Sequence, residues 1–574
     1  MDRVQMGTIA LAVLLLVFWF TTLPESQSPE PGTPIAEPIE RPREAPPIAP
    51  LVERGALPVP ERADDQSRQE PVTRATLEND ALRLVVSSLG GRLESIQLKA
   101  YPARLGAVEE PVELVTLPTR GTGLVLLGDG PFRGLESLSH ERVSARSREV
   151  KLRLDRGGLQ IERTISVDDS GYGGWIRVSV RNRSSQTLIP KIELVWYGAE
   201  RSSDAGDHFV NYSLVALAGE GLERRVISGL GKPGMMQSFF GGGLWTGESY
   251  PPAVEWAGIE SRYFLVGGVA ENPADARAFL GPLGLNQGSA SLLYPGIEIP
   301  PGRELKRSYR VYFGPKLVEA VAPVDVRLEP ALQVGWAWIR PLVSLFQSLL
   351  TWIHTHLVSN YGIAIIILTI VLRILTFPLT QKSMTSMRRF SDLAPEMKKV
   401  QGKYKEDKTR LQQEMMALYK RKGVNPLTAM GGGCLPMLIQ FPFLVGLYFA
   451  LQGSIELRHA PFFAWINDLS TPETLLSIAG VPIRVLPLLM GGSMVLQQRL
   501  TPSAGGDPQQ KQMMQWMSVM FVFLFYQFPS GLVLYWFVSN LLGIAQQHWV
   551  NRKPKGVEKE ATPRGWWLRF RRVQ

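Results

Sequence analysis

Short alternating runs of apolar and polar residues fill the chain between residues 72 and 330. Examples are Leu159–Ile165 and Trp175–Val180, and Gly, Asp, Asn and Pro residues separate such runs. Period-two alternation bounded by turn residues predicts strands with one buried face, and many such strands in succession are typical of a β-sandwich. We therefore predict an all-β sandwich domain over 72–330, which is long enough to bury its own core.

Long apolar runs form the second pattern and predict membrane-spanning helices. Met6–Leu23 is close to spanning length. No small-residue cleavage site follows it, so residues 1–23 are interpreted as an uncleaved signal-anchor helix. Five later runs raise the prediction to a polytopic α-helical membrane protein with six transmembrane helices, and the run at 482–500 is the weakest because it is short and holds Arg484 and Gln497. The later spans are predicted at 354–380, 426–452, 482–500, 513–529 and 531–549.

Two further segments join these parts. Residues 24–71 hold twelve prolines among Glu, Arg, Ser and Ala, a composition that predicts an extended, disordered linker. Residues 331–353 space their apolar and polar positions as an amphipathic helix with an aromatic-rich face, which suits a membrane interface. Trp336 and Trp338 would be its interfacial anchors, and an ordinary domain-packing helix is the alternative.

Charge is distributed unevenly along the chain, and this asymmetry predicts its orientation. Segment 381–425 holds twelve Lys and Arg residues against five acidic ones, and the tail 550–574 holds eight against two. Lys and Arg gather on the cytoplasmic side of membrane proteins, so both segments are predicted to be cytoplasmic. Six spans satisfy this condition, with 24–353 and the loop 453–481 outside and the loop 501–512 inside. Removing the weakest span would put the basic tail outside.

Segment 381–425 also has helical periodicity, because apolar residues recur at spacings of three and four from Met384 to Tyr404 and again after it. We predict a hairpin of two antiparallel helices, with Asp407 capping the second helix and Gly423 ending it. A basic outer surface would suit ribosomal RNA or anionic lipid headgroups, although the positive-inside rule alone also explains the charge. Methionines add apolar surface that adapts to varied partners, with core filling as the alternative. The candidate contact residues are Arg388, Arg389, Lys398, Lys399, Met415 and Met416.

Composition excludes several other kinds of site. The single cysteine, Cys434, rules out an intrachain disulfide and a multi-cysteine metal site, and the six histidines are scattered along the chain. No phosphate-binding loop is present, so no cofactor, metal site or catalytic residue is expected. The formal net charge of +10 is not spread evenly, so it does not by itself indicate nucleic acid, and no DNA partner is expected.

Arg373 lies inside the apolar run Tyr361–Pro378 of the first span after the sandwich. A charge at this depth is costly, and such residues usually face a cavity and serve function. Acidic residues after position 345 all fall in predicted loops, the hairpin or the tail, so we expect water or a group from outside the chain to pair with Arg373. Snorkelling to the interface is the alternative, but counting from Lys382 places Arg373 roughly 13 Å deep.

Other polar side chains in the predicted spans could wet a groove around Arg373 or bond between helices. A transporter would instead want intramembrane acids as coupling residues, and the spans hold none, so a polytopic transporter is the weaker alternative. The polar candidates are Thr369, Thr376, Gln440, Ser518, Gln527, Ser539, Asn540 and Gln546.

Seven short stretches between residues 355 and 550 resemble the YidC/Oxa/Alb family of membrane protein insertases, in the Gram-negative form with a large periplasmic domain. The resemblance implies a protein of the bacterial inner membrane that inserts and helps fold membrane proteins, alone or with the Sec translocon, through a hydrophilic, positively charged groove. It also implies that the last five spans form the insertase core, and that the sandwich is galactose-mutarotase-like. The stretches are Phe377–Thr380, Gln413–Lys420, Asn425–Leu427, Cys434–Pro442, Ala460–Phe462, Trp465–Leu469 and Phe528–Tyr535.

The resemblance assigns roles to particular positions of this chain. Arg373 stands where the family has its groove arginine, and Thr369 matches a position on the substrate-contacting face. In the last span the pair Tyr535-Trp536 places Trp536 at a contact position that is commonly tyrosine, so the hydroxyl would be missing there. Gln440 is the groove candidate of the third span, whose start the stretch Thr428–Gly433 could shift because it is longer than the usual linker.

The resemblance implies partners as well. Nascent membrane proteins and the lipid bilayer are expected, with the ribosome bound through the basic hairpin and the tail, and one copy of the chain is expected to suffice. Residues 24–353 would be periplasmic, and the hairpin and C-terminus cytoplasmic. A membrane-anchored periplasmic carbohydrate-binding protein is the remaining alternative. A sugar-modifying site could recruit residues whose spacing is not diagnostic: Asp204, Asp207, His208, Glu255 and Glu260.

Overall fold

The computed structural model describes residues 72–106, 110–200, 212–219, 221–231, 245–422, 435–478, 481–500 and 508–552. The chain divides into two compact units, with the boundary between Gln333 and Val334. The predicted signal anchor, the Pro-rich linker, Gly423, the stretch Thr428–Gly433 and most of the basic tail lie outside the described residues.

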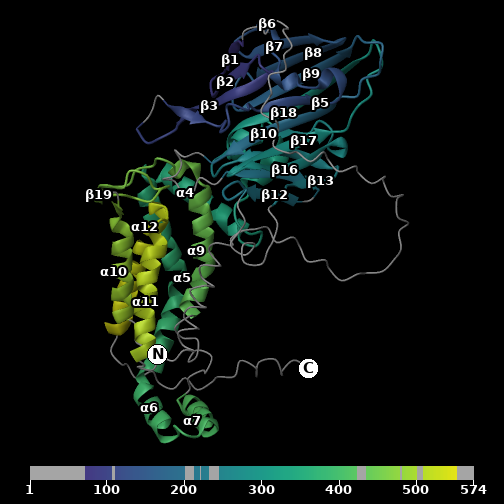
Figure 1. The fold of residues 1–574 in the computed structure, drawn as a ribbon. Helices are drawn as coiled ribbons and strands as arrows, with labels where there is room; N and C mark the ends of the chain where they lie inside the picture. The colour runs from purple at the N-terminus through teal and green to yellow at the C-terminus, as the bar shows by residue number, and fades with distance from the viewer. Residues whose placement is uncertain are drawn as a thin grey trace, which may run out of the picture. The chain divides into compact units, whose positions relative to one another are not determined.

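The described residues of the first unit form three antiparallel sheets, and the prediction of a β-sandwich is confirmed. The largest has nine strands in the order β12-β11-β14-β15-β18-β9-β8-β7-β6. The next has five, in the order β13-β16-β17-β10-β5, and a four-stranded meander runs β1-β2-β3-β4 (Figure 1). The nine-stranded sheet comprises β6 (Glu141–Ala145), β7 (Glu149–Arg156), β8 (Leu159–Val167), β9 (Gly173–Asn182), β11 (Ser213–Ala218), β12 (Gly221–Val226), β14 (Val254–Glu260), β15 (Phe264–Val269) and β18 (Glu304–Pro315).

The two larger sheets pack face to face as a sandwich. Trp196 of the five-stranded sheet meets Phe313 of β18 edge to face, with ring centroids 5.9 Å apart, and both are fully buried. A Cβ on Gly268 of β15 would lie 2.1 Å from Leu194 Cδ2, so glycine is needed for this close approach. The remaining strands are β1 (Arg74–Glu78), β2 (Leu82–Ser87), β3 (Arg92–Pro102), β4 (Pro111–Glu113), β5 (Gly123–Leu127), β10 (Lys191–Ala199), β13 (Glu248–Tyr250), β16 (Arg277–Gly284) and β17 (Gln287–Tyr294), with 3₁₀ turns η1 (Gly130–Phe132), η2 (Leu135–Ser137) and η4 (Pro273–Asp275).

The end of the first unit is helical and belongs to the sandwich core. After β18 the chain forms α3 (Val318–Val321) and the 3₁₀ helix η5 (Val326–Leu332). Leu328 and Ala331 of η5 are fully buried and cluster with Trp256 of β14. The first residues of the predicted interfacial helix, 331–333, therefore belong to the sandwich unit instead.

The amphipathic helix that follows is α4 (Arg340–His356), so it begins later than the predicted residue 331. Its buried residues recur at three and four, which confirms the predicted periodicity. Trp336 and Trp338 precede the helix: they stack with centroids 5.9 Å apart, and Trp336 also meets Phe449 edge-on. Trp338 is exposed and Trp336 packs on the bundle core, so only Trp338 has the exposure expected of an interfacial anchor. The buried face comprises Val343, Phe346, Leu350 and Ile353.

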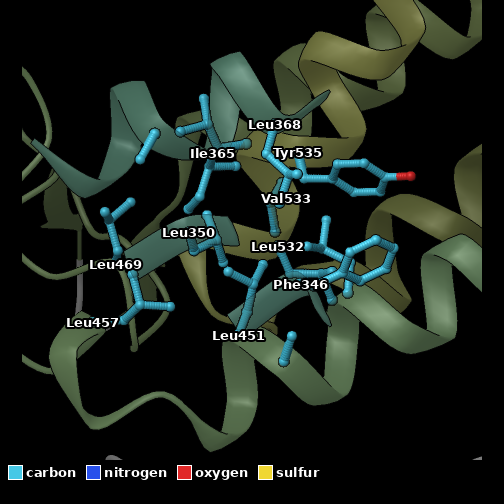
Figure 2. Packing of buried hydrophobic residues seen from close by; sticks show 14 of the residues in the cluster. Phe346, Leu350, Ile365, Leu368, Leu451, Leu457, Leu469, Leu532, Val533 and Tyr535 are labelled. Carbon is cyan, nitrogen blue, oxygen red and sulfur yellow. The ribbon is translucent and has the colours of Figure 1, made fainter. Parts of the chain in front are cut away.

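The second unit is a helical bundle around one apolar core (Figures 1 and 2). α12 packs on both α5 and α10, α11 packs on α10, and α4 packs on α9 and α5, whereas α5 and α9 contact each other little. Figure 2 shows side chains from α4, α5, α9, α12 and the loop after α9 meeting in this core. The long helices are α5 (Tyr361–Asp392), α9 (Leu435–Gly453), α10 (Val485–Leu500), α11 (Pro508–Phe525) and α12 (Ser530–Arg552).

The outer surface of the bundle carries large apolar side chains. Ile374 and Leu375 are each 68% exposed and Phe523 is 76% exposed. Large apolar side chains with this much exposure are typical of a surface that contacts lipid or protein rather than water. Within the described residues, Tyr361–Pro378 is the helical stretch long and apolar enough to cross a membrane, and Trp516–Phe525 is a shorter apolar stretch. The count of six spans stays a prediction.

The predicted helical hairpin is present as α6 (Ala394–Lys403) and α7 (Lys408–Arg421). Its seam has its own small core of Leu393, Met397, Leu418 and Tyr419, separate from that of the bundle. Asp407 caps α7 as expected, since its carboxylate accepts the Arg410 backbone N–H at 2.9 Å. The hairpin was predicted over 381–425, but α5 continues without a break to Asp392, so the hairpin helices begin later than residue 381.

One loop ties together the first turns of three helices. Residues 454–484 contain the 3₁₀ helix η6 (Ile455–Leu457) and the strands β19 (Leu476–Ile478) and β20 (Val481–Ile483). Asn360, just before α5, donates to Pro461 O and Phe462 O of this loop, at 3.3 and 3.4 Å. The backbone N–H groups of Ser530 and Gly531 in α12 donate to the same loop, and its Glu473 accepts the Leu486 N–H of α10 at 2.7 Å. The loop therefore fixes the spacing of α5, α10 and α12 at this end of the bundle.

Gly362 is the tightest contact of this loop with α5, so its replacement by alanine is expected to destabilise the bundle. An ideal Cβ there would lie 2.0 Å from Cδ2 of the Phe462 ring. Overpacking of this kind costs about 1–3 kcal/mol, which should lower the thermal unfolding midpoint of the purified protein. The control is Gly492→Ala in α10, where a Cβ meets nothing within 4 Å. Equal midpoints for the two variants would show that the Phe462 contact is not needed.

Candidate functional site

A polar cavity lies within the helical bundle, between α5, α9 and α12. The space between its lining residues, counted together with the open solvent that it joins, is about 360 Å³. The α5 contribution recurs at spacings of three and four, which places these residues on one helix face. The lining residues are Thr369, Leu372, Arg373, Thr376 and Thr380 of α5, Gln440 and Phe443 of α9, and Tyr535 and Ser539 of α12.

The threonines of α5 make the cavity polar without disturbing their helix. Thr369 donates to Ile365 O at 2.6 Å, Thr376 donates to Leu372 O at 2.8 Å, and Thr380 donates to Thr376 O. Such bonds to the preceding turn satisfy a hydroxyl donor inside an apolar segment. The hydroxyl oxygens keep lone pairs for a further donor, so this face of α5 is polar while its outer face is apolar.

Among the residues that the structure describes, Arg373 makes three hydrogen bonds, and all of them go to Ser539 of α12. Its Nε donates to Ser539 Oγ at 3.1 Å, and its Nη2 donates to Ser539 O at 2.6 Å and to Ser539 Oγ at 2.7 Å. Gln440 Nε2 donates to the same Oγ at 3.2 Å. The expectation that only water or an outside group would pair with Arg373 is therefore wrong, since the chain supplies a neutral partner.

The partner of Arg373 does not neutralise its charge. Ser539 offers a hydroxyl and a carbonyl oxygen, and within the described part of the chain Arg373 has no ion pair with a carboxylate. A buried ion without a counter-ion is costly unless hydrogen bonds and water compensate it. The cavity thus presents a net positive charge in a mostly apolar bundle.

Tyr535, rather than Trp536, is the aromatic residue of α12 that lines the cavity. Figure 2 shows its ring extending from the apolar core and ending in the hydroxyl oxygen. Trp536 packs instead on α11, with its ring centroid 5.8 Å from Phe521 and 4.9 Å from Phe525. The interpretation that the cavity aromatic has lost its hydroxyl is corrected accordingly.

Of three other polar candidates, one extends the cavity and two lie outside it. Gln546 of α12 continues its polar face, because its Nε2 donates to Thr380 Oγ1 at 2.9 Å. Asn540 instead bonds Ser493 of α10 at 3.1 Å and Ser518 bonds Gln498, so these groups hold helices together. Sequence reasoning had named Ser539 only as one of several wetting groups. The sequence feature that could have singled out Ser539 is its position in an apolar run, four residues before Gly543.

The hairpin candidates do not line the cavity. Lys398, Lys399 and Met416 are exposed on α6 and α7, so their side chains are free to meet a partner. Met415 packs against the hairpin seam and matches the core-filling alternative. The side chains of Arg388 and Arg389 lie outside the described residues.

The sandwich gives little support to a sugar-modifying site. Glu260 is buried and bound by Arg224 Nε at 2.6 Å and Lys316 Nζ at 2.9 Å, so it serves an internal ion cluster. Asp204, Asp207 and His208 lie outside the described residues. Among the residues that are described, no group of three or more His, Cys, Asp or Glu could hold a metal ion.

Two family models match the chain in succession. One, described as the YidC periplasmic domain, matches residues 74–345, and the other, described as the 60Kd inner membrane protein, matches residues 352–558. The membrane protein insertase YidC of Syntrophus aciditrophicus is 34% identical over 543 residues, which cover 91% of each chain. That of Maridesulfovibrio salexigens is 34% identical over 572 residues, which cover 95% of this chain and 98% of the relative.

Solved structures give similar names at lower similarity. A crystal structure of an active YidC insertase with its first transmembrane domain resolved has 17% identity and a TM-score of 0.35, and the match covers 83% of this chain and 94% of that one. A galactose mutarotase-like protein from Lactobacillus casei has 10% identity and a TM-score of 0.30, over 42% of this chain and all of that one.

These matches define a membrane protein insertase of the inner membrane, with a periplasmic β-sandwich domain. Proteins of this class take newly made membrane proteins as substrates and work in the lipid bilayer. The chain belongs to the YidC family, within the wider Oxa/Alb family, as its motifs had predicted.

Proposed function

We propose that the cavity around Arg373 receives the polar segment that a substrate must move across the membrane. The observation that carries this proposal is a guanidinium that, in the described part of the chain, is held by neutral oxygens alone, at the wall of a polar cavity inside a bundle with an apolar outer surface. A polar or acidic segment is costly to place in hydrocarbon. Hydroxyls, an amide and one positive charge part-way through the bilayer lower that cost.

The substrate's apolar helix then leaves the cavity toward lipid along α5 and α12. Ile374 and Leu375 of α5 present exposed apolar surface next to the cavity-lining Arg373 and Thr376 on the same helix. The step from a polar face to an apolar face on one helix allows the two parts of a substrate to separate. No catalytic residue or cofactor is needed, because the work is partition between two environments.

The wider arrangement is part of the same proposal. Six spans place residues 24–353 in the periplasm and the hairpin and C-terminus in the cytoplasm, which the basic segments favour. The exposed Lys398 and Lys399, together with the basic tail, supply a surface for the ribosome or anionic headgroups. The insertase acts alone or beside the Sec translocon, and a single copy of the chain contains the complete cavity.

Crosslinking tests whether the cavity is the substrate path. In a Cys434→Ser background, Thr376→Cys is expected to crosslink a ribosome-bound nascent chain with one hydrophobic span, at chain lengths that bring its polar segment into the membrane. Phe523→Cys is the control, because this residue of α11 is exposed but does not line the cavity. Equal yields at both positions, or a yield at Phe523 alone, would rule out the cavity as the path.

A further inference from the structure

We propose that Ser539 is a positioning residue that fixes the charge of Arg373 in the cavity, and that it thereby makes the insertase favour substrates with carboxylates in the translocated segment. This inference rests on the proposed function of the cavity. Ser539 holds the guanidinium in place, and the charge held there favours one kind of substrate segment.

The contact is specific because two neighbouring donors on one side of the guanidinium, Nε and Nη2, bond to one residue. Nε and Nη2 of Arg373 share Ser539 Oγ, at 3.1 and 2.7 Å, and Nη2 also reaches Ser539 O at 2.6 Å. The planar guanidinium presents its donors in fixed directions, so two contacts on one side set the orientation of the whole group. Ser539 is 2% exposed, so its oxygens are buried with this partner.

Gly543 leaves space for the hydrogen bonds between Arg373 and Ser539. In a helix the carbonyl of residue 539 faces the turn that contains residue 543, and its second lone pair is open only if that turn leaves space. A Cβ on Gly543 would lie 3.5 Å from Arg373 Nη2 and 2.8 Å from Gln497 Nε2. A larger side chain at this position would enter the space that the guanidinium occupies.

The remaining donors of Arg373 are the ones a substrate would meet. No hydrogen bond of Nη1 is found within the described residues, and Arg373 lines the cavity. A substrate carboxylate would form a charge-assisted bond, which is about twice as strong as a neutral one. A neutral amide offers Arg373 nothing that Ser539 does not already supply. Because Arg373 is already bonded to Ser539, the cavity should favour a charged substrate group over one that is merely polar.

Without Ser539 the same charge would be free to leave the cavity. Arginine has a long flexible stem that can carry its head toward the aqueous interface. The carbonyl of residue 539 alone would hold one nitrogen and leave the plane of the guanidinium free to turn. Substrates with carboxylates should then lose their advantage, while neutral substrates are unaffected.

The test compares two single-span substrates in proteoliposomes containing the full-length protein. Their translocated segments differ only in carrying Asp and Glu or the matching Asn and Gln. Ser539→Ala is expected to lower the ratio of acidic to neutral insertion rates about fivefold, the change that about 1 kcal/mol produces. Ser539→Thr keeps the hydroxyl and should retain the ratio, and Gly543→Val should lower it with Ser539 intact.

A double variant separates this inference from the function on which it rests. In an Arg373→Ala background, Ser539→Ala should cause no further change in the ratio. If Arg373→Ala lowers the ratio and Ser539→Ala does not, the inference is overturned and the proposed function stands. If Arg373→Ala leaves the ratio unchanged, the proposed function itself fails. If Ser539→Ala slows both substrates equally, its role is structural and the inference is wrong.

Discussion

Arg373→Glu is expected to abolish insertion of a short single-span substrate whose translocated segment is acidic, whereas Arg373→Lys keeps much of it. The glutamate would place a negative charge at the cavity wall, beside Ser539 and Gln440. Two unit charges 4 Å apart interact by about 4 kcal/mol at an effective dielectric constant of 20. Changing attraction to repulsion on this scale lowers the rate by far more than tenfold, because each 1.4 kcal/mol is tenfold.

The lysine variant separates charge from geometry. Lysine keeps the positive charge but is a point donor, so it cannot reproduce the contact that Nε and Nη2 of Arg373 make together with Ser539. We therefore expect lysine to retain insertion with a smaller preference for acidic segments. Insertion is measured as protease protection of the translocated segment in proteoliposomes.

The control for charge reversal is Arg183→Glu, an exposed residue of the sandwich unit. It should insert the substrate as well as the unaltered protein does. Full activity of a folded, well-expressed Arg373→Glu variant would eliminate the electrostatic part of the proposal. Loss of activity in both variants would point to an effect of net charge rather than of the cavity.

Periodicity predicted the kinds of elements well because burial controls it. Alternation in β9 and the three-four spacing in α4 both appear as buried positions in the structure. Element ends were predicted less well because local backbone chemistry sets them. Gly335 has a positive φ of 83° and Pro341 lies in the first turn of α4, so the helix begins at Arg340 although the apolar pattern starts earlier.

For α4 the predicted start was too early, whereas for the long helix α5 the predicted end was too early. Pro378 and the charge-rich segment after it suggested an end near residue 380, yet the helix continues to Asp392. Proline is tolerated in membrane helices when nearby groups satisfy the freed backbone. The chain breaks instead before Pro395, which lies in the first turn of α6. The presence of a proline was therefore not enough to predict whether α5 ends near Pro378 or before Pro395.

The cavity was predictable in part. Thr369 and Arg373 share a helix face by spacing alone, so one wall of the site follows from α5. The partner of Arg373 comes from α12, 166 positions away, and depends on how the two helices are rotated against each other. The same rotation decides between Tyr535 and Trp536, which point in directions about 100° apart because a helix has 3.6 residues per turn.

The ion cluster of the sandwich gives the largest expected effect on stability. Glu260 of β14 is buried with Lys316, and both charges lie near Arg224. Arg224 Nη2 also donates to Ala331 O at 3.2 Å and Gln333 O at 3.3 Å, at the end of the unit. Burial acts to raise the pKa of Glu260, but the neighbouring Lys316 and Arg224 outweigh it and lower this pKa below its ordinary value of 4.5.

Glu260→Ala is expected to destabilise the sandwich unit by about 3–5 kcal/mol, because it leaves Lys316 buried without a partner. Pulse proteolysis of the full-length protein in urea measures this from the fragment that covers the sandwich. The matched control is Glu304→Ala, whose carboxylate pairs with Arg181 and Lys306 near the surface. Such a pair is worth about 0–1 kcal/mol. A double variant, Glu260→Ala with Lys316→Met, should recover most of the loss.

The same cluster predicts how the effect depends on pH. Since the folded pKa of Glu260 lies below its unfolded value, its carboxylate contributes stability above pH 4.5, and this contribution is lost as the pH falls through the folded pKa. The gap in unfolding free energy between the unaltered protein and Glu260→Ala should therefore be constant near neutral pH and narrow only below about pH 4.5. A gap that narrows already between pH 7 and pH 5 would mean that Glu260 is not held ionised by Lys316 and Arg224.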